Sequence, residues 1–324
     1  MSATLLLHVP ASGSPEDNGK ALSRFLAEEG EGVFSRLLAF PDHVTSWRAS
    51  ASETSDLPQG DEILAVSDEL SDSARTLGRA LQNTFTREAS AHLRDALTET
   101  AAVRRTCGFT YASHPDLGQP AGRARSFDGL QALVAPEALP ASQRRDMIRC
   151  MFGILFAAGG SPVVALDQFG DSERTSGLST SEYEEEDSTE ILERLAADLG
   201  SPDSPLFDGW SDAVELLRVR ESLAALRDEA SNEHVVDTVE NGIALLRGDV
   251  NAPDSGLILA LANPTSEVVE VNVDRRTLGG ATPVVMRECI SGDTVYIPQA
   301  GNHVLSIDLE PYEVMWLDLG GEDG

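Results

Sequence analysis

The chain has 324 residues, of which 41% are hydrophobic, so it is long enough for two domains and can bury a sizeable core. Its 54 acidic and 24 basic residues give a formal net charge of -30, and Lys20 is its one lysine. A surface this negative repels phosphate backbones and anionic lipid, which excludes nucleic acid and membrane surfaces as partners.

The charge pattern also indicates the solvent in which the protein works. Many carboxylates with almost no lysine are typical of a halophile, because multimolar salt screens the repulsion between acidic groups. The alternative is an acidic protein of ordinary salt with an arginine bias. We adopt the halophilic interpretation as a hypothesis.

The cysteines and the N-terminus bear on compartment and cofactors. Cys107, Cys150 and Cys289 are odd in number and far apart, which favours neither a disulfide framework nor a zinc site. The N-terminal segment lacks a basic region before its short apolar run, and no stretch has the length of a membrane-spanning helix. We therefore expect a soluble cytoplasmic protein, and no motif calls for a cofactor or a metal.

The first third of the chain reads as an α/β region. Residues 4–10 form a short apolar run that predicts a buried strand, and residues 14–40 carry apolar residues at helical intervals. Residues 46–62 are rich in Ser, Asp and Glu and predict a linker. A strand is predicted over 61–69, and one or two amphipathic helices over 71–105.

The middle of the chain alternates strands and helices, as in an α/β layer with a parallel sheet. A long polar loop in this region is of the kind that carries function after a parallel strand. The predicted elements are strands 107–113 and 161–166, helices 142–160, 188–200 and 209–229, and the polar loop 167–189.

From about residue 233 the pattern changes to short strands separated by turns. Apolar and polar residues alternate there, which predicts antiparallel half-buried strands. The predicted strands lie within 256–264, 267–274, 303–310 and 312–319. Residues 233–324 are therefore expected to form a small β-sandwich.

The order of these pieces resembles the last quarter of the barrel and the C-terminal domain of the α-amylase superfamily of glycoside hydrolases. The match extends over roughly residues 89–320 and is closest to the sucrose phosphorylase branch. "GGSPVVALDQFG" is similar to that family's eighth barrel strand. "ILALANPTSEVVEVNV", "ISGDTVYI" and "PYEVMWL" are similar to its C-terminal domain.

This resemblance implies an α/β plus all-β fold. Residues 106–232 would be a partial (β/α) barrel-type region, and 233–324 a C-terminal antiparallel β-sandwich. Residues 1–105 would be an N-terminal α/β region of uncertain role. An incomplete barrel exposes sheet edges, which proteins usually cover. We expect residues 1–105, a protein partner or a second copy of the chain to cover them.

The resemblance also assigns candidate sugar contacts in "FTYASHPDLG", residues 109–118. In the family, a His and an adjacent Asp follow the seventh strand and contact the sugar. His114 matches the His, but Pro115 stands in the place of the Asp, and Asp116 follows one residue later. That shift moves a carboxylate by about 3.3 Å and turns it to the other face of an extended chain.

Catalytic placement tolerates far less than such a shift, so Asp116 is only a weak catalytic candidate. The alternative is an exposed loop histidine followed by a turn-forming aspartate. Of the family's Arg-rich signature after the eighth strand, only Arg174 remains. The implied substrate-binding residues are therefore His114, Asp116 and Arg174.

The family's catalytic carboxylates have no acceptable match. A retaining glycosidase needs a nucleophile and a general acid about 5 Å apart, and the family places its nucleophile in an Arg-x-Asp strand motif. Arg94 and Asp95 are adjacent in a helical pattern, and Asp128 is three residues after Arg125 in a predicted loop. Asp167 ends the presumed eighth strand without the Arg.

We therefore expect a pseudoenzyme, a non-catalytic carbohydrate-related binding or regulatory protein whose ligand is a small sugar or oligosaccharide. The alternative is a divergent α-glucoside phosphorylase or glycoside hydrolase acting on sucrose-like or α-glucan substrates. Asp68 and Glu69, at the end of a predicted strand, would favour the enzyme if they lay near His114. A purely structural protein with a recycled fold is a third interpretation.

The net charge of -30 generates a prediction about salt. The Debye length is about 10 Å at 0.1 M and about 3 Å at 1 M, so added salt removes most long-range repulsion between the carboxylates. The midpoint of thermal unfolding should therefore rise with added KCl over the series 0.1, 1 and 3 M. Screening saturates near molar salt, so a continued rise from 1 to 3 M would indicate salting-out of apolar surface and ions held between carboxylates. A midpoint that stays flat or falls over this series would contradict the halophilic interpretation.

Overall fold

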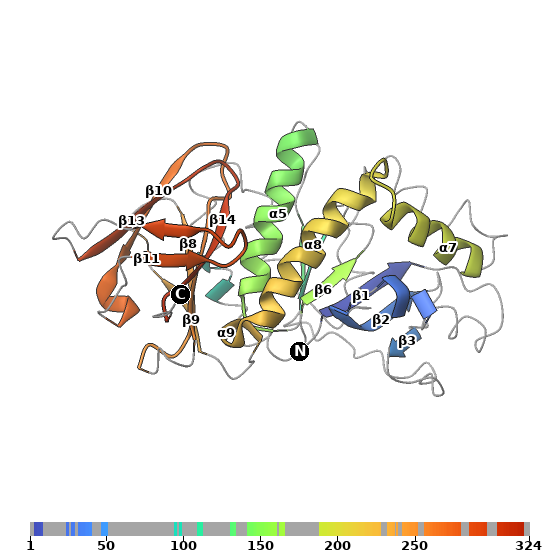
Figure 1. Ribbon diagram of the computed structural model, residues 1–324, viewed down its shortest axis with the longest axis horizontal. Coiled ribbons are helices and arrows are strands. Elements are labelled where there is room, and N and C mark those ends of the chain that lie inside the picture. The colour runs from blue at the N-terminus through green and yellow to red at the C-terminus, as the bar shows by residue number, and fades with distance from the viewer. Residues whose placement is uncertain are drawn as a thin grey trace.

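The computed structural model describes part of the chain. The described residues are 3–8, 24–25, 27–29, 32–40, 47–50, 94–95, 97–98, 109–112, 130–133, 141–160, 162–165, 188–227, 232–236, 238, 242–251, 256–279, 285–296 and 303–320. Within these ranges the structure contains a mostly parallel sheet, a central helical layer and an antiparallel β region (Figure 1). None of the described helices is long and apolar enough to cross a bilayer.

The first sheet has six strands in the order β3-β2-β1-β6-β4-β5. β1 pairs in parallel with β2 and β6, β4 pairs in parallel with β5 and β6, and β3 runs antiparallel to β2. The bounds are β1 Ala3–His8, β2 Phe34–Phe40, β3 Trp47–Ser50, β4 Phe109–Ala112, β5 Leu130–Leu133 and β6 Pro162–Ala165. The predicted strands at 4–10, 107–113 and 161–166 are thereby confirmed.

The structure differs from two predictions for the N-terminal region. The helix predicted over 14–40 does not continue through β2, although residues 24–25 and 27–29 are helical. The reason lies in "EGEG", because Gly32 has φ of 75°, a left-handed conformation that ends a helix. The linker predicted over 46–62 contains β3, which gains backbone hydrogen bonds from β2.

The described strands of the first sheet form an open sheet. They form a sheet with β3 and β5 at its two ends, and within the described residues these ends do not meet. Strands from 1–105 and 106–232 share this sheet, so the N-terminal region contributes strands β1 to β3 rather than a separate layer. The barrel itself and the boundaries at 105 and 232 stay predictions.

The helical layer confirms three predicted helices. α5 is Ala141–Ala157, α7 is Ser188–Leu199, and α8 is Pro205–Ser222, followed by the short α9 Ala224–Arg227. Gly200, the last residue of the helix predicted over 188–200, follows α7 directly. α8 begins four residues earlier than predicted because the Ser204 hydroxyl caps it, accepting from the Leu206 N–H at 3.2 Å, and Pro205 occupies the first turn.

α5 lies between the antiparallel β region and α8, as Figure 1 shows. Its second half is apolar all round, and every residue from Met151 to Ala158 is buried. A helix of this kind must be covered on several sides. α8 covers one side, and β9 and β14 cover another.

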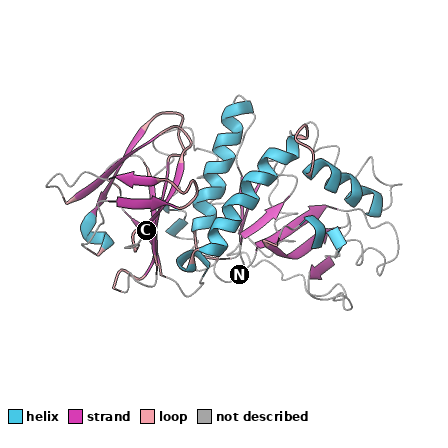
Figure 2. Cartoon of the chain, in the orientation of Figure 1, coloured by secondary structure: helices cyan, strands magenta, loops and turns pink. Residues whose placement is uncertain are grey.

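The antiparallel region contains the strands predicted there and four more (Figure 2). A six-stranded sheet has the order β12-β11-β14-β9-β8-β7, and β10 pairs with β13 in a two-stranded sheet. The bounds are β7 Glu233–Val236, β8 Ile243–Gly248, β9 Leu257–Ala262, β10 Val269–Asp274, β11 Val285–Glu288, β12 Thr294–Tyr296, β13 Val304–Leu309 and β14 Val314–Asp318.

β9 is buried on both faces, whereas the sequence pattern predicted a half-buried strand. Ile258, Ala260 and Ala262 belong to a first core shared with α5 and α8. The residues between them belong to a second core, which β10 and β13 cover. α5 thus takes the place of solvent on one face of the sheet, so the first core extends from the parallel sheet into the antiparallel region.

Two turns quoted for the family resemblance are held by buried polar side chains. Asn263 is fully buried, and its Nδ2 donates to the carbonyls of Glu267 at 2.7 Å and Glu310 at 2.8 Å. In the "SG" turn, Gly292 has φ of 81°, and the carboxylate of the buried Glu288 accepts from the N–H groups of Ser291 and Trp316. Both turns therefore have a structural reason for their residue types.

Close packing of α5 on β14 leads to a prediction at Gly153. A Cβ there would lie 2.6 Å from both methyl groups of Val314, which has a stiff β-branched side chain. Gly153→Ala should lower the free energy of unfolding by about 1–2 kcal/mol, because overpacking outweighs the gain in helix propensity. Urea unfolding in 3 M KCl measures the change.

Two further variants test the cause. Gly200→Ala is the control, because its nearest neighbouring atom would lie 3.5 Å away, an ordinary contact. Val314→Ala added to Gly153→Ala should restore part of the lost stability. If the double variant is as unstable as the sum of both single variants, the clash is not the cause.

Candidate functional site

The parallel strands bring five chain segments to one edge of the first sheet. β1 ends at His8, β2 at Phe40, β4 at Ala112, β5 at Leu133 and β6 at Ala165. Because these strands run in parallel, their carboxyl ends meet at the same edge. This carboxyl edge is where open α/β sheets and barrels bind ligands, so it is the candidate site.

His8 stands at the centre of the carboxyl edge. β1 lies between β2 and β6, with Leu6 opposite Ala165 and His8 opposite Phe40. His8 is therefore two residues beyond Leu6, the last residue of β1 that pairs with β6. The chain leaving β1 goes on to β2, whereas the chain leaving β6 goes on to α7.

The predicted site residues His114, Asp116 and Arg174 lie outside the described residues, as do Asp68 and Glu69. Their position in the chain still relates them to the carboxyl edge. His114 and Asp116 follow the end of β4 by two and four residues, and Arg174 follows the end of β6 by nine. The segments that carry them thus start from neighbouring strands of one edge.

The sequence pattern missed a further pair of candidates. Asp42 and His43 come directly after β2 and Pro41, and the helix predicted over 14–40 concealed that a strand ends there. The glycines of "EGEG" were the available signal for a break before this strand. With Asp167, two residues after β6, a histidine or an aspartate closely follows or ends β1, β2, β4 and β6.

The entry of β6 into the sheet is fixed by a buried arginine. Arg220 of α8 is 2% exposed and donates to the carbonyls of Phe156, Ala158 and Gly160, the last two at 3.0 and 2.8 Å. These carbonyls end α5 and begin the turn into β6, which starts two residues after Gly160. Arg220 therefore positions the strand that leads to Asp167.

A second buried arginine joins the same turn to the antiparallel region. Arg247 of β8 donates to the carbonyls of Ala157 at 3.0 Å and Ala225 at 3.2 Å. Its Nη1 lies 3.9 Å from the buried carboxylate of Glu233, which also accepts from the Gly159 N–H. Guanidinium groups suit this place because the carboxyl end of a helix carries partial negative charge.

The described cysteines are not activated nucleophiles. Burial raises the pKa of the Cys289 thiol to about 12, and burial also raises the pKa of the fully buried Cys150 thiol. Both are therefore protonated at neutral pH, whereas nucleophilic cysteines act as thiolates. Within the described ranges, three or more His, Cys, Asp or Glu residues do not gather in a way that could hold a metal ion.

Comparison with known proteins gives weak likenesses. No protein-family model and no curated protein matches the chain. A maltogenic α-amylase from Thermotoga neapolitana is 17% identical over 54% of this chain and 36% of its own, with a TM-score of 0.36. An Anoxybacillus α-amylase is 14% identical over 99% of this chain and 53% of its own, with a TM-score of 0.44.

A third solved structure, AmyP in complex with maltose, is 10% identical over 98% of this chain and 86% of its own, with a TM-score of 0.46. The chain thus spans about a third and about half of the Thermotoga and Anoxybacillus enzymes. At these identities and TM-scores the likenesses establish neither the family nor the activity of this chain.

The Arg220 contacts generate a prediction about the scaffold of the site. Arg220→Met keeps much of the apolar stem but leaves three buried carbonyls without these donors. The free energy of unfolding should therefore fall by about 3 kcal/mol or more. Urea unfolding in 3 M KCl is the measurement. Arg227→Met, at an exposed position of α9, is the matched control and should change stability by less than about 0.5 kcal/mol. Equal losses in both variants would refute the role given to Arg220.

Proposed function

We propose that this chain is a carbohydrate-related binding or regulatory protein without glycosidase chemistry, and that the carboxyl edge of its parallel sheet binds a small sugar or oligosaccharide. The observation that carries the proposal is that β4 and β6 are paired in parallel. The segments that follow these two strands therefore leave the same edge of the sheet side by side. The His114–Asp116 segment follows β4, and the Asp167 segment follows β6. β1, ending at His8, is the next strand beyond β6.

The chemistry of these residues suits sugar hydroxyls. A neutral imidazole both donates and accepts hydrogen bonds, a carboxylate accepts, and a guanidinium donates in a fixed fork. In this proposal His114 and Asp116 bind hydroxyl groups at one side of the sugar, and Arg174 binds from the loop after β6. These are the contacts that the α-amylase resemblance of the sequence implies.

The described strands of the parallel sheet carry no Arg-x-Asp motif, and the motif Arg247–Asp249 begins instead on β8 of the antiparallel region. This placement supports a binding role over a catalytic one. Glycoside hydrolysis by the retaining route needs two carboxylates about 5 Å apart with distinct roles. Asp116 stands one residue away from the family's position, which is too far for a group that must contact the reacting carbon. The protein would thus bind its ligand and leave the glycosidic bond intact.

A divergent α-glucoside phosphorylase or hydrolase is the second candidate. The observation that favours it is that Asp42, Asp116 and Asp167 follow three different strands of the carboxyl edge. Strand ends are where enzymes of this architecture place catalytic carboxylates. In that case two of these three aspartates would share the acid and nucleophile roles.

The setting and the partners belong to the same proposal. We infer a salt-rich cytoplasm from the composition, and a protein partner or a second copy of the chain as the cover for sheet edges. In the described part of the chain, β3 and β5 are the outer strands of the parallel sheet. Either outer strand would offer backbone groups for pairing.

Sugar titration tests the proposed function. Maltose and sucrose, added in 3 M KCl and followed by calorimetry, should bind saturably. His114→Ala and Asp116→Asn should each weaken binding about tenfold, the loss expected for one or two hydrogen bonds. His234→Ala is the control, because His234 is an exposed residue of β7 in the other sheet. No saturable binding of either sugar, or an equal loss in the control, would contradict the proposal.

The same samples separate the two candidate functions. Incubation with maltooligosaccharides, or with sucrose and phosphate, should release no product if the chain only binds. Turnover that persists through purification and disappears in Asp42→Asn, Asp116→Asn or Asp167→Asn would establish the enzyme instead.

A further inference from the structure

β10 and β13 form a two-stranded antiparallel sheet that covers the second core. Val269, Val271 and Val273 alternate with polar residues along β10, and they are buried against Leu305 and Leu309 of β13 and the rest of that core. Two strands alone are marginally stable in water. This pair therefore depends on its apolar inner face and on the side chains that oppose each other on its outer face.

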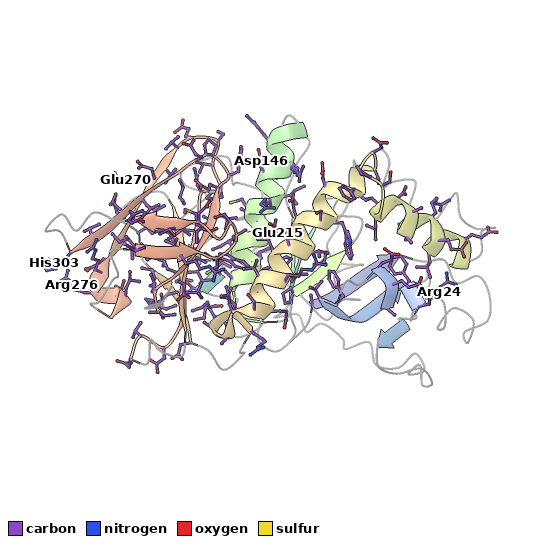
Figure 3. All side chains as sticks on the ribbon, viewed as in Figure 1. Arg24, Asp146, Glu215, Glu270, Arg276 and His303 are labelled. Carbon is purple, nitrogen blue, oxygen red and sulfur yellow. The ribbon has the colours of Figure 1, made fainter. Side chains whose placement is uncertain are left out.

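The outer face of the two-stranded sheet holds two opposed carboxylates. Glu270 of β10 is directly opposite Asp308 of β13, and both are exposed. Figure 3 labels Glu270 on the outer side of the antiparallel region, and the Ser306 hydroxyl donates to its carboxylate. Directly opposed residues have Cβ atoms about 5 Å apart, and like charges at this separation destabilise a strand pair.

This arrangement differs from the other charged pairs in the described registers. Two other directly opposed pairs have a charge on both residues, and both are attractive. They are Glu233 with Arg247 between β7 and β8, and Arg287 with Asp318 between β11 and β14. Among the strands that the structure describes, Glu270 and Asp308 are thus the one directly opposed pair of like charge.

We infer that the β10–β13 sheet is a salt-dependent element, whose closure over the second core is controlled by the Glu270–Asp308 repulsion. At 0.1 M salt the Debye length of about 10 Å exceeds the separation of the two carboxylates. Their repulsion is then largely unscreened and weakens the pairing of β10 with β13. At multimolar salt the Debye length falls to about 3 Å or less, and the sheet closes on its apolar face. This inference does not depend on sugar binding.

A double-mutant cycle tests the inference. Glu270→Gln and Asp308→Asn each remove one charge, and the Gln keeps an oxygen that accepts from Ser306. Each single variant should raise the melting midpoint by about 2 °C at 0.1 M KCl and by less than about 1 °C at 3 M. The double variant should gain less than the sum of the single variants, because either substitution alone ends the repulsion.

Glu193→Gln is the control matched in net charge. Glu193 is exposed on α7 and its substitution also removes one negative charge. Equal stabilisation by Glu193→Gln at 0.1 M KCl would show that only the overall charge matters, which would overturn the inference. Strict additivity of the two β-sheet variants would overturn it as well.

Hydrogen exchange locates the effect. As KCl is lowered from 3 to 0.1 M, the amides that pair β10 with β13 should lose protection at a higher salt concentration than those that pair β8 with β9. The Glu270→Gln variant should move the β10–β13 loss to lower salt. Simultaneous loss in both sheets, or no shift in the variant, would contradict a local salt-dependent element.

Discussion

The carboxyl end of α5 is the point on which the rest of the structure depends. The last carbonyls of a helix have no partners within it, and here they are buried, so other groups must satisfy them. Arg220 and Arg247 do so from opposite sides, one from α8 and one from β8. Only a guanidinium offers several donors in a fixed fork, so lysine would not replace either residue.

These contacts couple the two halves of the molecule. The turn that Arg220 holds leads into β6, at the centre of the parallel sheet, and the helix end that Arg247 holds packs against the antiparallel sheet. The apolar second half of α5 fills the space between them. A displacement of α5 would therefore move both the candidate site and the covered face of the β region.

The charges of the chain are divided by environment. The buried Arg220 and Arg247 donate hydrogen bonds to backbone carbonyls at helix ends. Arg149 is more exposed and joins α5 to α8 through ion pairs with Asp212 at 2.6 Å and Glu215 at 2.8 Å. Most acidic residues in the described ranges lie at exposed or half-buried positions, where salt must offset the repulsion. At Glu270 and Asp308 this excess lies on a strand pair, so the effect of salt becomes local.

Sequence by itself determined the types of many elements, because periodicity and turn residues are local properties. The strands β1, β4 and β6, the helices α5 and α7, and the alternation of β10 and β13 followed from it. It failed at β2, where the apolar residues of "FSRLLAF" fit a helical spacing too, and only pairing with β1 decided for a strand. It also predicted that one face of β9 is exposed to solvent, which was wrong. α5 covers that face, and α5 comes from a distant part of the chain that a local pattern does not include.

The candidate site was divided in the same way. The resemblance of the sequence pointed to His114, Asp116 and Arg174, and a local motif can carry that much. Tertiary structure decided that β4, β6 and β1 are neighbours, so that segments separated by more than a hundred residues start from one edge. It also supplied Asp42 and His43, which the helix predicted over 14–40 had concealed, because strand order is fixed by backbone pairing across the sheet rather than by the residues next in the chain.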